Sequence, residues 1–269
     1  MRALCNAIVL SVLVLAAAGP FLANPPVAGA QSTPAAQVAK VAGDSLYARF
    51  DFEGSLKQYQ AGLAADSASY DLWWRTARSL VDRGARAEYD KRKPDAQTAF
   101  TQAVRAARKA TALSPDGWEG HEMLALSLGR LALFQGGKEK IRISKEVKAE
   151  VDRSIGLNPN ADRSYHILAR WNRGITTLSF FEKAAAKVVY GGVPKGATLE
   201  NAVTYLEKAV EINPRNANHH LELGKTYLEL DLNAKAREQF EKALACPQTS
   251  PFDKEYKEEA QSLLSKMKS

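Results

Sequence analysis

Small residues recur at fixed spacing along this chain, and this recurrence limits its possible folds more than any other feature. Near the carboxyl end, Gly224 and Tyr227 are followed by Ala236, Phe240 and Ala243. Two antiparallel helices approach to about 8–10 Å only where small residues face each other, and larger side chains fill the space one or two turns away. The spacing therefore predicts a hairpin of two packed helices.

The same spacing occurs four more times upstream. The second helices of these units carry Ser55, Tyr59, Gly62 and Ser67; Ala103, Ala107, Ala110 and Pro115; Val147, Val151, Ser154 and Pro159; and Ala202, Leu206, Ala209 and Pro214. This pattern is typical of the tetratricopeptide repeat, a helical hairpin of about 34 residues. A bundle of alanine-rich helices is the alternative, but bundles show no fixed period. The sequence predicts an all-α solenoid of tetratricopeptide repeats.

The phase of the repeat sets the expected boundaries. We expect a flexible tail at 31–35, five hairpins, and a carboxyl-terminal capping helix with one apolar and one charged face. The hairpins are expected at 36–69, 70–117, 118–161, 162–216 and 217–249, and the cap at 250–269.

Three of the expected units are longer than the usual period. In the second and third units, residues 82–94 and 134–143 are charged or contain glycine and proline, which predicts lengthened turns. In the fourth unit, apolar residues recur at helical spacing to about Tyr190, and the segment 191–194 ends this pattern with Gly-Gly-Val-Pro. We expect an additional helix there, with Thr198 capping the helix that follows.

The first 30 residues have the organisation of an export signal. Arg2 supplies a positive start, residues 7–15 are apolar except for Ser11, and residues 28–30 are small, as a signal peptidase requires. The apolar stretch is shorter than the roughly 20 residues of a membrane-spanning helix. We expect a cleaved signal peptide and a periplasmic or secreted protein; an uncleaved membrane anchor is the alternative.

Charge and motifs exclude several kinds of function. The formal net charge is +7, but basic and acidic residues alternate along the chain, whereas nucleic-acid binding needs clustered Lys and Arg. His121-Glu122 lacks the second histidine of a zinc-protease motif, and His121 and His220 occupy the packing position that Trp73 fills in the second unit. The sequence contains no phosphate-binding loop and no paired cysteines. We expect no nucleic-acid partner, no metal, no cofactor and no enzymatic activity.

The repeat phase also predicts the inner, concave wall. Its candidate binding residues are Lys40, Tyr47, Trp74, Arg78, His166, Arg170, Arg173 and Lys225. Arg binds carboxylates bidentately, and Trp and Tyr add apolar area with a polar edge. We therefore expect the groove to bind a protein or peptide partner with an acidic or carboxylate-bearing segment. The alternatives are that these charges are merely solvated while Trp74 packs between hairpins, or that the wall carries a lipid or other amphipathic anion; an enzyme with an unrecognised site is a third.

Three segments resemble a known family. They are "WWRTAR" at 73–78, "LARWNRGITTLSFFEKAAAKVVYGGVPKGATLENAVTYLEKAVEINP" at 168–214, and the "HHLELGKTYLEL" that follows. The most specific positions are Trp74, Arg75 and Arg78, and then Phe181, Glu182, Lys183, Pro194, Lys195 and Gly196. The chain is similar here to the tetratricopeptide domain of the regulator of microtubule dynamics family. The resemblance implies an all-α, non-enzymatic interaction domain that is associated in animals with microtubules and sometimes tethered to membranes.

Overall fold

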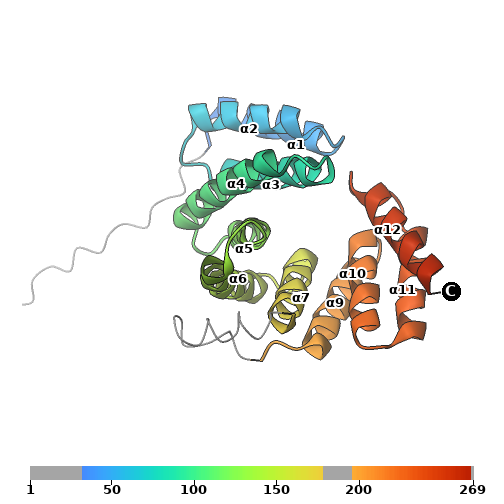
Figure 1. The fold of residues 1–269 in the computed structure, drawn as a ribbon. Coiled ribbons are helices and arrows are strands. Elements are labelled where there is room, and N and C mark those ends of the chain that lie inside the picture. Colours follow the sequence, from blue (N-terminus) through green and yellow to red (C-terminus); the bar gives the residue numbers. More distant parts are fainter. Residues whose placement is uncertain (1–31, 178–195, 268–269) are drawn as a thin grey trace, which may run out of the picture. The chain divides into compact units, whose positions relative to one another are not determined.

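The computed structural model describes residues 32–177 and 196–267, which form eleven α-helices and no strand (Figure 1). The expected signal peptide and the expected additional helix up to Tyr190 lie outside these residues. The helices are α1 (Pro34–Tyr47), α2 (Phe52–Ala65), α3 (Tyr70–Tyr89), α4 (Lys93–Leu113), α5 (Trp118–Ala132), α6 (Gly137–Leu157), α7 (Asp162–Thr176), α9 (Leu199–Ile212), α10 (Ala217–Glu229), α11 (Asn233–Ala245) and α12 (Asp253–Lys266). No helix in the described ranges combines the length and the apolar character needed to cross a membrane.

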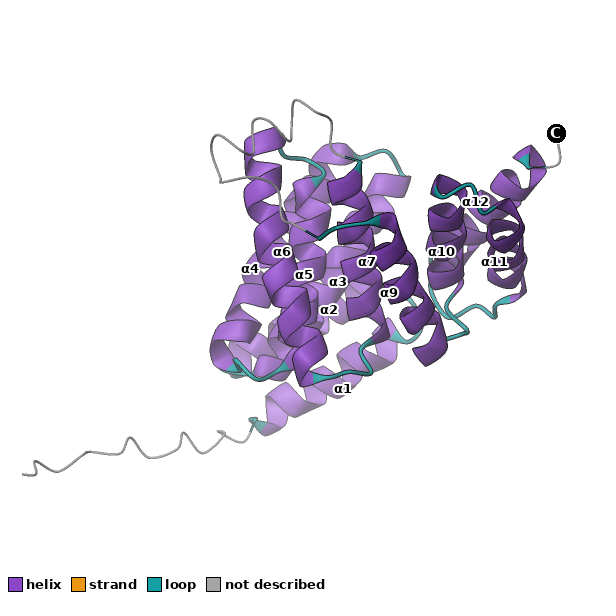
Figure 2. Cartoon of the chain, turned by 90° about the horizontal axis from the view of Figure 1, so that it is seen from below, coloured by secondary structure: helices purple, strands orange, loops and turns teal. Residues whose placement is uncertain are grey.

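The helices pack in sequence order as hairpins. The pairs α1 and α2, α3 and α4, α5 and α6, α7 and α9, and α10 and α11 make the most extensive contacts, and α12 covers α10 and α11 (Figure 2). Each hairpin then packs on the next one along the chain, as repeats of a solenoid do. The prediction of an all-α tetratricopeptide solenoid is confirmed, and so is the cap of α9, where Thr198 Oγ1 accepts a hydrogen bond from the Asn201 amide.

A glycine facing a ring holds several hairpins together. A Cβ atom placed on Gly224 would lie 2.5 Å from Cε1 of Phe240, whose ring is fully buried. Only glycine therefore lets α10 and α11 approach this closely. The same contact pairs Gly43 with Tyr59 and Gly84 with Phe100.

A second contact repeats at the start of the first helix of each of three hairpins. Nε1 of Trp73 donates a hydrogen bond to the carbonyl of Ser67, six residues earlier, at 2.9 Å. Nε2 of His121 and Nε2 of His220 lie 2.9 Å from carbonyls at the same offset, those of Pro115 and Pro214. The contact satisfies a carbonyl where one hairpin ends and the next begins, and it agrees with the packing role expected of both histidines.

Two expected turns are wrong. Residues 82–89 belong to α3 and α4 begins at Lys93, so only residues 90–92 form the turn; likewise α6 begins at Gly137, inside the segment expected to be a turn. Both helices of the second hairpin are longer than predicted because Gly84 meets Phe100 and adds another buried layer. The expected tail is also shorter, because Thr33 caps α1 and Pro34 occupies its first turn.

The last helix contacts the first two hairpins. The ring of Phe252, just before α12, stacks on Phe52 and on Tyr89, with centroids 6.1 and 5.6 Å apart. Nη1 of Arg86 donates to Oε1 of Glu255 at 2.6 Å. Repeats of a solenoid ordinarily contact only their neighbours, so these five side chains, here called the closing contact, add a junction that the repeat pattern does not require.

Candidate functional site

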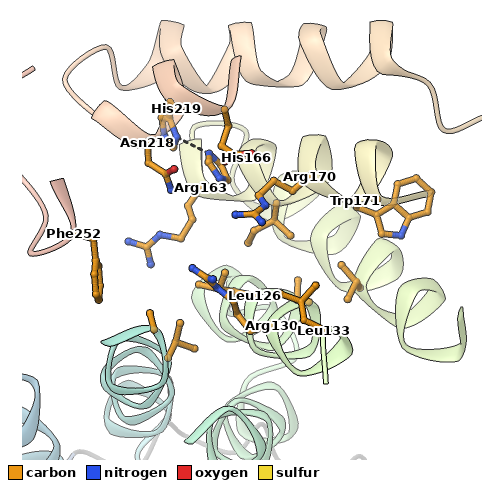
Figure 3. A pocket seen from close by; sticks show the side chains of 18 of the residues that line it. Leu126, Arg130, Leu133, Arg163, His166, Arg170, Trp171, Asn218, His219 and Phe252 are labelled. Atoms are coloured by element: carbon orange, nitrogen blue, oxygen red, sulfur yellow. Dashed lines mark hydrogen bonds between the residues drawn. The ribbon is translucent and has the colours of Figure 1, made fainter. Parts of the chain in front are cut away.

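The inner surface of the solenoid encloses a pocket of about 660 Å³ (Figure 3). Its lining extends from Tyr47 at the end of α1 to Tyr256 on α12, and the closing contact contributes Phe52 and Phe252. Seven basic side chains and four acidic ones line it: Arg78, Arg130, Lys140, Arg163, Arg170, Arg173 and Lys225 against Asp82, Asp162, Glu222 and Glu229. Its volume lies in the usual range of small-molecule sites, and its basic excess favours an anion.

Three arginines reach into this pocket from two helices (Figure 3). Arg130 is on α5 and has Glu88 Oε2 at 3.2 Å, while Arg163 on α7 has Glu122 Oε1 at 3.5 Å. Arg170, also on α7, is exposed and makes no hydrogen bond or ion pair with any residue that the structure describes. A guanidinium has five N–H donors, so these three retain capacity to bind a carboxylate or a phosphate.

Apolar side chains form another part of the lining. They are contributed mainly by α5, α6 and α7: Leu126, Leu133, Ile141, Val147, Ile167, Trp171 and Ile175. Trp171 is positioned by a hydrogen bond of 2.7 Å from Nε1 to the carbonyl of Ser144, while Leu133 is 58% exposed. A lining that combines these apolar side chains with three arginines suits a ligand with one charged end and one apolar end.

Two buried histidines and one aspartate form a hydrogen-bonded chain at the pocket wall. Nδ1 of His166 lies 2.9 Å from Nδ1 of His219, and Nε2 of His219 lies 3.0 Å from Oδ2 of Asp162. Burial lowers the pKa of both imidazoles below their ordinary value of 6.5. Burial also acts to raise the pKa of Asp162, but hydrogen bonds from His219 and Asn213 outweigh it and hold this pKa below its usual value. Nowhere in the described ranges do three or more His, Cys, Asp or Glu gather as a metal would require.

Two of the predicted groove residues already have acidic partners. Nη1 of Arg173 lies 2.5 Å from Glu222 Oε2, and Nζ of Lys225 lies 2.9 Å from both Glu222 Oε1 and Glu259 Oε1. Burial acts to raise the pKa of Glu222, but Arg170, Lys225 and Arg173 outweigh it and hold the carboxyl ionised. This cluster is close to neutral, so the basic excess lies with the three arginines.

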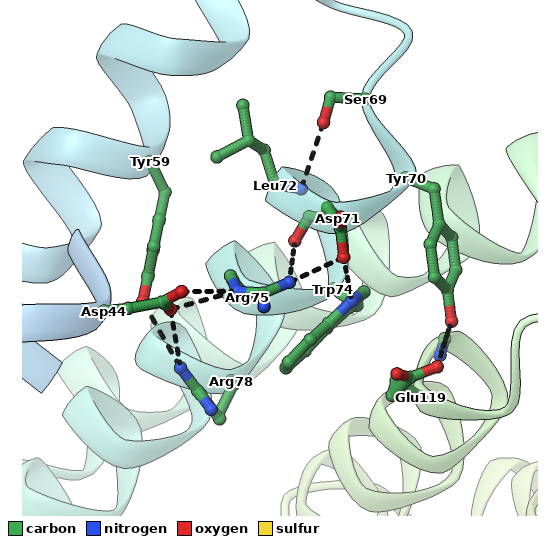
Figure 4. Close-up of polar contacts among 11 residues, drawn as sticks. Asp44, Tyr59, Ser69, Tyr70, Asp71, Leu72, Trp74, Arg75, Arg78 and Glu119 are labelled. Carbon is green, nitrogen blue, oxygen red and sulfur yellow. Dashed lines mark hydrogen bonds and ion pairs between the residues drawn. The ribbon is translucent and has the colours of Figure 1, made fainter. Parts of the chain in front are cut away.

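The Trp-Arg-x-x-Arg motif has a structural role (Figure 4). Arg75 Nε lies 2.9 Å from Asp44 Oδ1, and Arg78 donates to the Tyr59 hydroxyl at 3.3 Å, so the motif ties α3 to the first hairpin. Arg78 also stacks on Tyr47, 3.6 Å from its ring centroid. Trp74 packs against these guanidiniums, donates to Asp71 at 3.3 Å, and does not line the pocket.

The structure brings most of the predicted groove residues to this pocket. Its lining includes Tyr47, Arg78, His166, Arg170, Arg173 and Lys225, but not Lys40 or Trp74. Many other lining residues were not predicted from the repeat phase, among them Arg130, Arg163, Asn218 and His219. The helical spacing could have indicated two of them. Arg130 follows the inner residue Leu126 by one helical turn and Arg163 precedes His166 by three residues, so each lies on the same helix face as an inner residue.

A comparison with protein families shows to which family the chain belongs. The family described as regulator of microtubule dynamics protein 1-3 matches residues 42–268. The chain belongs to this family.

Members of the regulator of microtubule dynamics family in animals are distant in sequence. The bovine protein 1 is 28% identical over 203 residues, which cover 74% of this chain and 62% of the relative. The protein 1 of Caenorhabditis elegans is 26% identical over 223 residues, covering 83% and 96%. The chain thus spans about three fifths of the length of the mammalian protein 1 relatives it matches.

A solved structure shares the fold of this family member. A thermophilic tetratricopeptide protein of Thermus thermophilus superposes with a TM-score of 0.61 at 14% identity, covering 85% of this chain and all of that one. The comparison shows that the fold is that of a tetratricopeptide solenoid, a type of fold with an extended concave surface.

Proposed function

We propose that this family member is a non-catalytic binding protein whose inner pocket holds an amphipathic anion. The observation that carries the proposal is the approach of Arg130, Arg163 and Arg170 to one cavity that also has an apolar wall. A carboxylate, sulfonate or phosphate accepts charge-assisted hydrogen bonds from these guanidiniums, and an apolar tail lies along Leu126 and Trp171.

The closing contact favours a small ligand over a long chain. Because Phe252 stacks on Phe52 and Tyr89, the described helices bound the pocket on the side where an open solenoid would leave a continuous groove. A long segment lying across all five hairpins would have to pass this junction. A lipid or another amphipathic anion of suitable size would occupy the pocket without breaking the closing contact.

An acidic peptide or protein segment is the second candidate. It is favoured by the placement of six predicted groove residues along the lining, from Tyr47 on α1 to Lys225 on α10. Extended segments are the usual ligands of concave solenoid surfaces. The two candidates share the anionic group, and they differ in whether an apolar tail is required.

A fluorescent probe distinguishes them. The probe is 1-anilinonaphthalene-8-sulfonate (ANS), an aromatic sulfonate, titrated into the purified full chain. We expect saturable binding of one ANS per chain that dodecanoate displaces and a hexaglutamate peptide does not. Displacement by hexaglutamate alone would support the second candidate, and the absence of saturable binding would contradict both. Native mass spectrometry, before and after solvent extraction, shows whether the purified chain already carries a small molecule.

The closing contact is expected to control how fast the ligand leaves. Stacked aromatic pairs contribute about 0.5–1.5 kcal/mol and half-exposed ion pairs about 0.2–1 kcal/mol. The double variant Phe52→Ala/Arg86→Gln should therefore release ANS about tenfold faster in stopped-flow displacement. Arg83→Gln, on the same helix but outside the pocket lining, is the control and should leave the rate unchanged. An unchanged rate in the double variant would show that the ligand leaves by another route.

A further inference from the structure

The Asp162–His219–His166 chain fixes the protonation of each ring. Asp162 is ionised and only accepts hydrogen bonds, so the nitrogen that faces it, Nε2 of His219, must carry a proton. A neutral His219 then has a bare Nδ1, which accepts. Nδ1 of His166, 2.9 Å away, must therefore be the donor, and this leaves Nε2 of His166 as a bare lone pair.

That lone pair has no partner in the described part of the chain. His166 is 6% exposed and lines the pocket, its Nδ1 is held by His219, and Nε2 makes no hydrogen bond with any described residue. Figure 3 shows the ring beside Arg163 and Arg170, at the same end of the cavity. Nε2 of His166 is thus a hydrogen-bond acceptor, not a donor, at the place where the proposed function puts the anionic group of the ligand.

The charges around His166 explain why it is neutral without a ligand. The charged and titratable groups that act on His166 are Arg170 from its own helix, His219 and Glu222 from α10, and Arg130 from α5. Those that act on its partner His219 are Asp162, Arg163 and His220. Burial is the largest effect that lowers the pKa of His166, and His219, Arg170 and Arg130 act in the same direction, opposed by Glu222. An anion bound among these arginines adds negative charge beside the ring, and an opposite charge at about 4–6 Å shifts a pKa by about 1–3.

We propose that the pocket takes up a proton together with its anion, and that His166 receives this proton on Nε2. This inference rests on the proposed function, because it concerns the same site. The protonated ring keeps its Nδ1 hydrogen bond to His219 and gains an Nε2–H that donates to the anion, so no side chain has to move. There is a pH range in which His166 is protonated when the anion is bound but neutral when it is not. The affinity for the anion rises as the pH falls through this range, and it is constant above the range.

Calorimetry of ANS binding tests this directly. The sulfonate keeps its charge between pH 5.5 and 7.5, so a change of affinity in this range comes from the protein. We expect the dissociation constant to fall by about five- to twentyfold from pH 7.5 to pH 5.5, since one proton taken up gives at most tenfold per pH unit. At pH 6.0, titrations in two buffers of different ionisation enthalpy should give an uptake of about half a proton to one proton per ANS bound.

Two variants identify the proton acceptor. His166→Asn keeps an amide donor that can reach His219 but cannot titrate, and it should abolish the uptake. His220→Asn is the matched control, because His220 is also buried but bonds to Gln239 on α11 and to the Pro214 carbonyl, and it does not line the pocket. It should retain the uptake, and circular dichroism checks that both variants are folded.

The outcomes distinguish a failure of this inference from a failure of the proposed function. If ANS does not bind, the proposed function fails. If ANS binds without proton uptake, or if His166→Asn takes up as many protons as the wild type, the proton-coupled inference fails while the proposed function stands. A further readout needs no variant: with only four histidines in the chain, long-range ¹H–¹⁵N spectra assign each tautomer. Without ligand, His166 should be protonated on Nδ1, and protonation on Nε2 instead would overturn the inference.

Discussion

Replacing Arg170 with glutamate is expected to weaken ANS binding by about 30- to 100-fold. The substitution removes charge-assisted hydrogen bonds, which contribute about 1.5–3 kcal/mol, and places a like charge beside the sulfonate. Arg170 makes no hydrogen bond or ion pair with the described residues, but its charge helps to hold the buried Glu222 ionised, so the melting temperature should fall by about 2–4 °C, as a loss of about 1 kcal/mol would cause. Fluorescence titration measures the affinity and thermal denaturation the stability.

Arg105→Glu is the matched control for this variant. Arg105 is on α4, is exposed, lies outside the pocket lining, and likewise has no hydrogen bond or ion pair within the described ranges. Both variants change the net charge equally, so a general electrostatic effect would weaken ANS binding to both. If the dissociation constant of ANS for Arg170→Glu were within threefold of that for the wild type, Arg170 would not be part of the binding site.

The largest loss of stability is expected for Phe240→Ala. The ring is fully buried and fills the space over Gly224, and removing such a ring costs about 3–5 kcal/mol because the backbone cannot close the cavity. The melting temperature should fall by roughly 10 °C. Phe50→Ala, at a site where the ring is 36% exposed, makes the same change of side chain and should cost about 1 kcal/mol or less.

The loss of stability in Phe240→Ala should first affect the last hairpin and its cap. Repeats contact mainly their neighbours, so the last hairpin and its cap can open while the earlier hairpins remain folded. Hydrogen exchange in Phe240→Ala should therefore accelerate first at Ala217–Ala245 and at Asp253–Lys266. Uniform acceleration over all described helices would instead show that the solenoid unfolds as one unit, with the closing contact as the additional link.

The candidate site was only partly predictable. Arg170 and His166 followed from the phase of the first helices, because residues one turn apart lie on the same face of a helix. The role of Arg78 did not, since its partners Asp44 and Tyr59 belong to the other hairpin. The extra length of the second hairpin was predicted but was assigned to its turn and not to its helices, because a charged stretch with one glycine and one proline has the composition of a turn whether or not Gly84 meets a ring.

The sequence by itself determined the hairpins, since helical period and side-chain size act within about 34 residues, and the recurrence of small residues records both. It also indicated a basic inner wall. The tertiary structure decided which arginines remain without a partner among the described residues, that His166 meets His219 across 53 residues, and that Phe252 returns to Phe52. These contacts depend on the rotation between successive hairpins, a small angle that accumulates along the solenoid and that no local spacing of residues specifies.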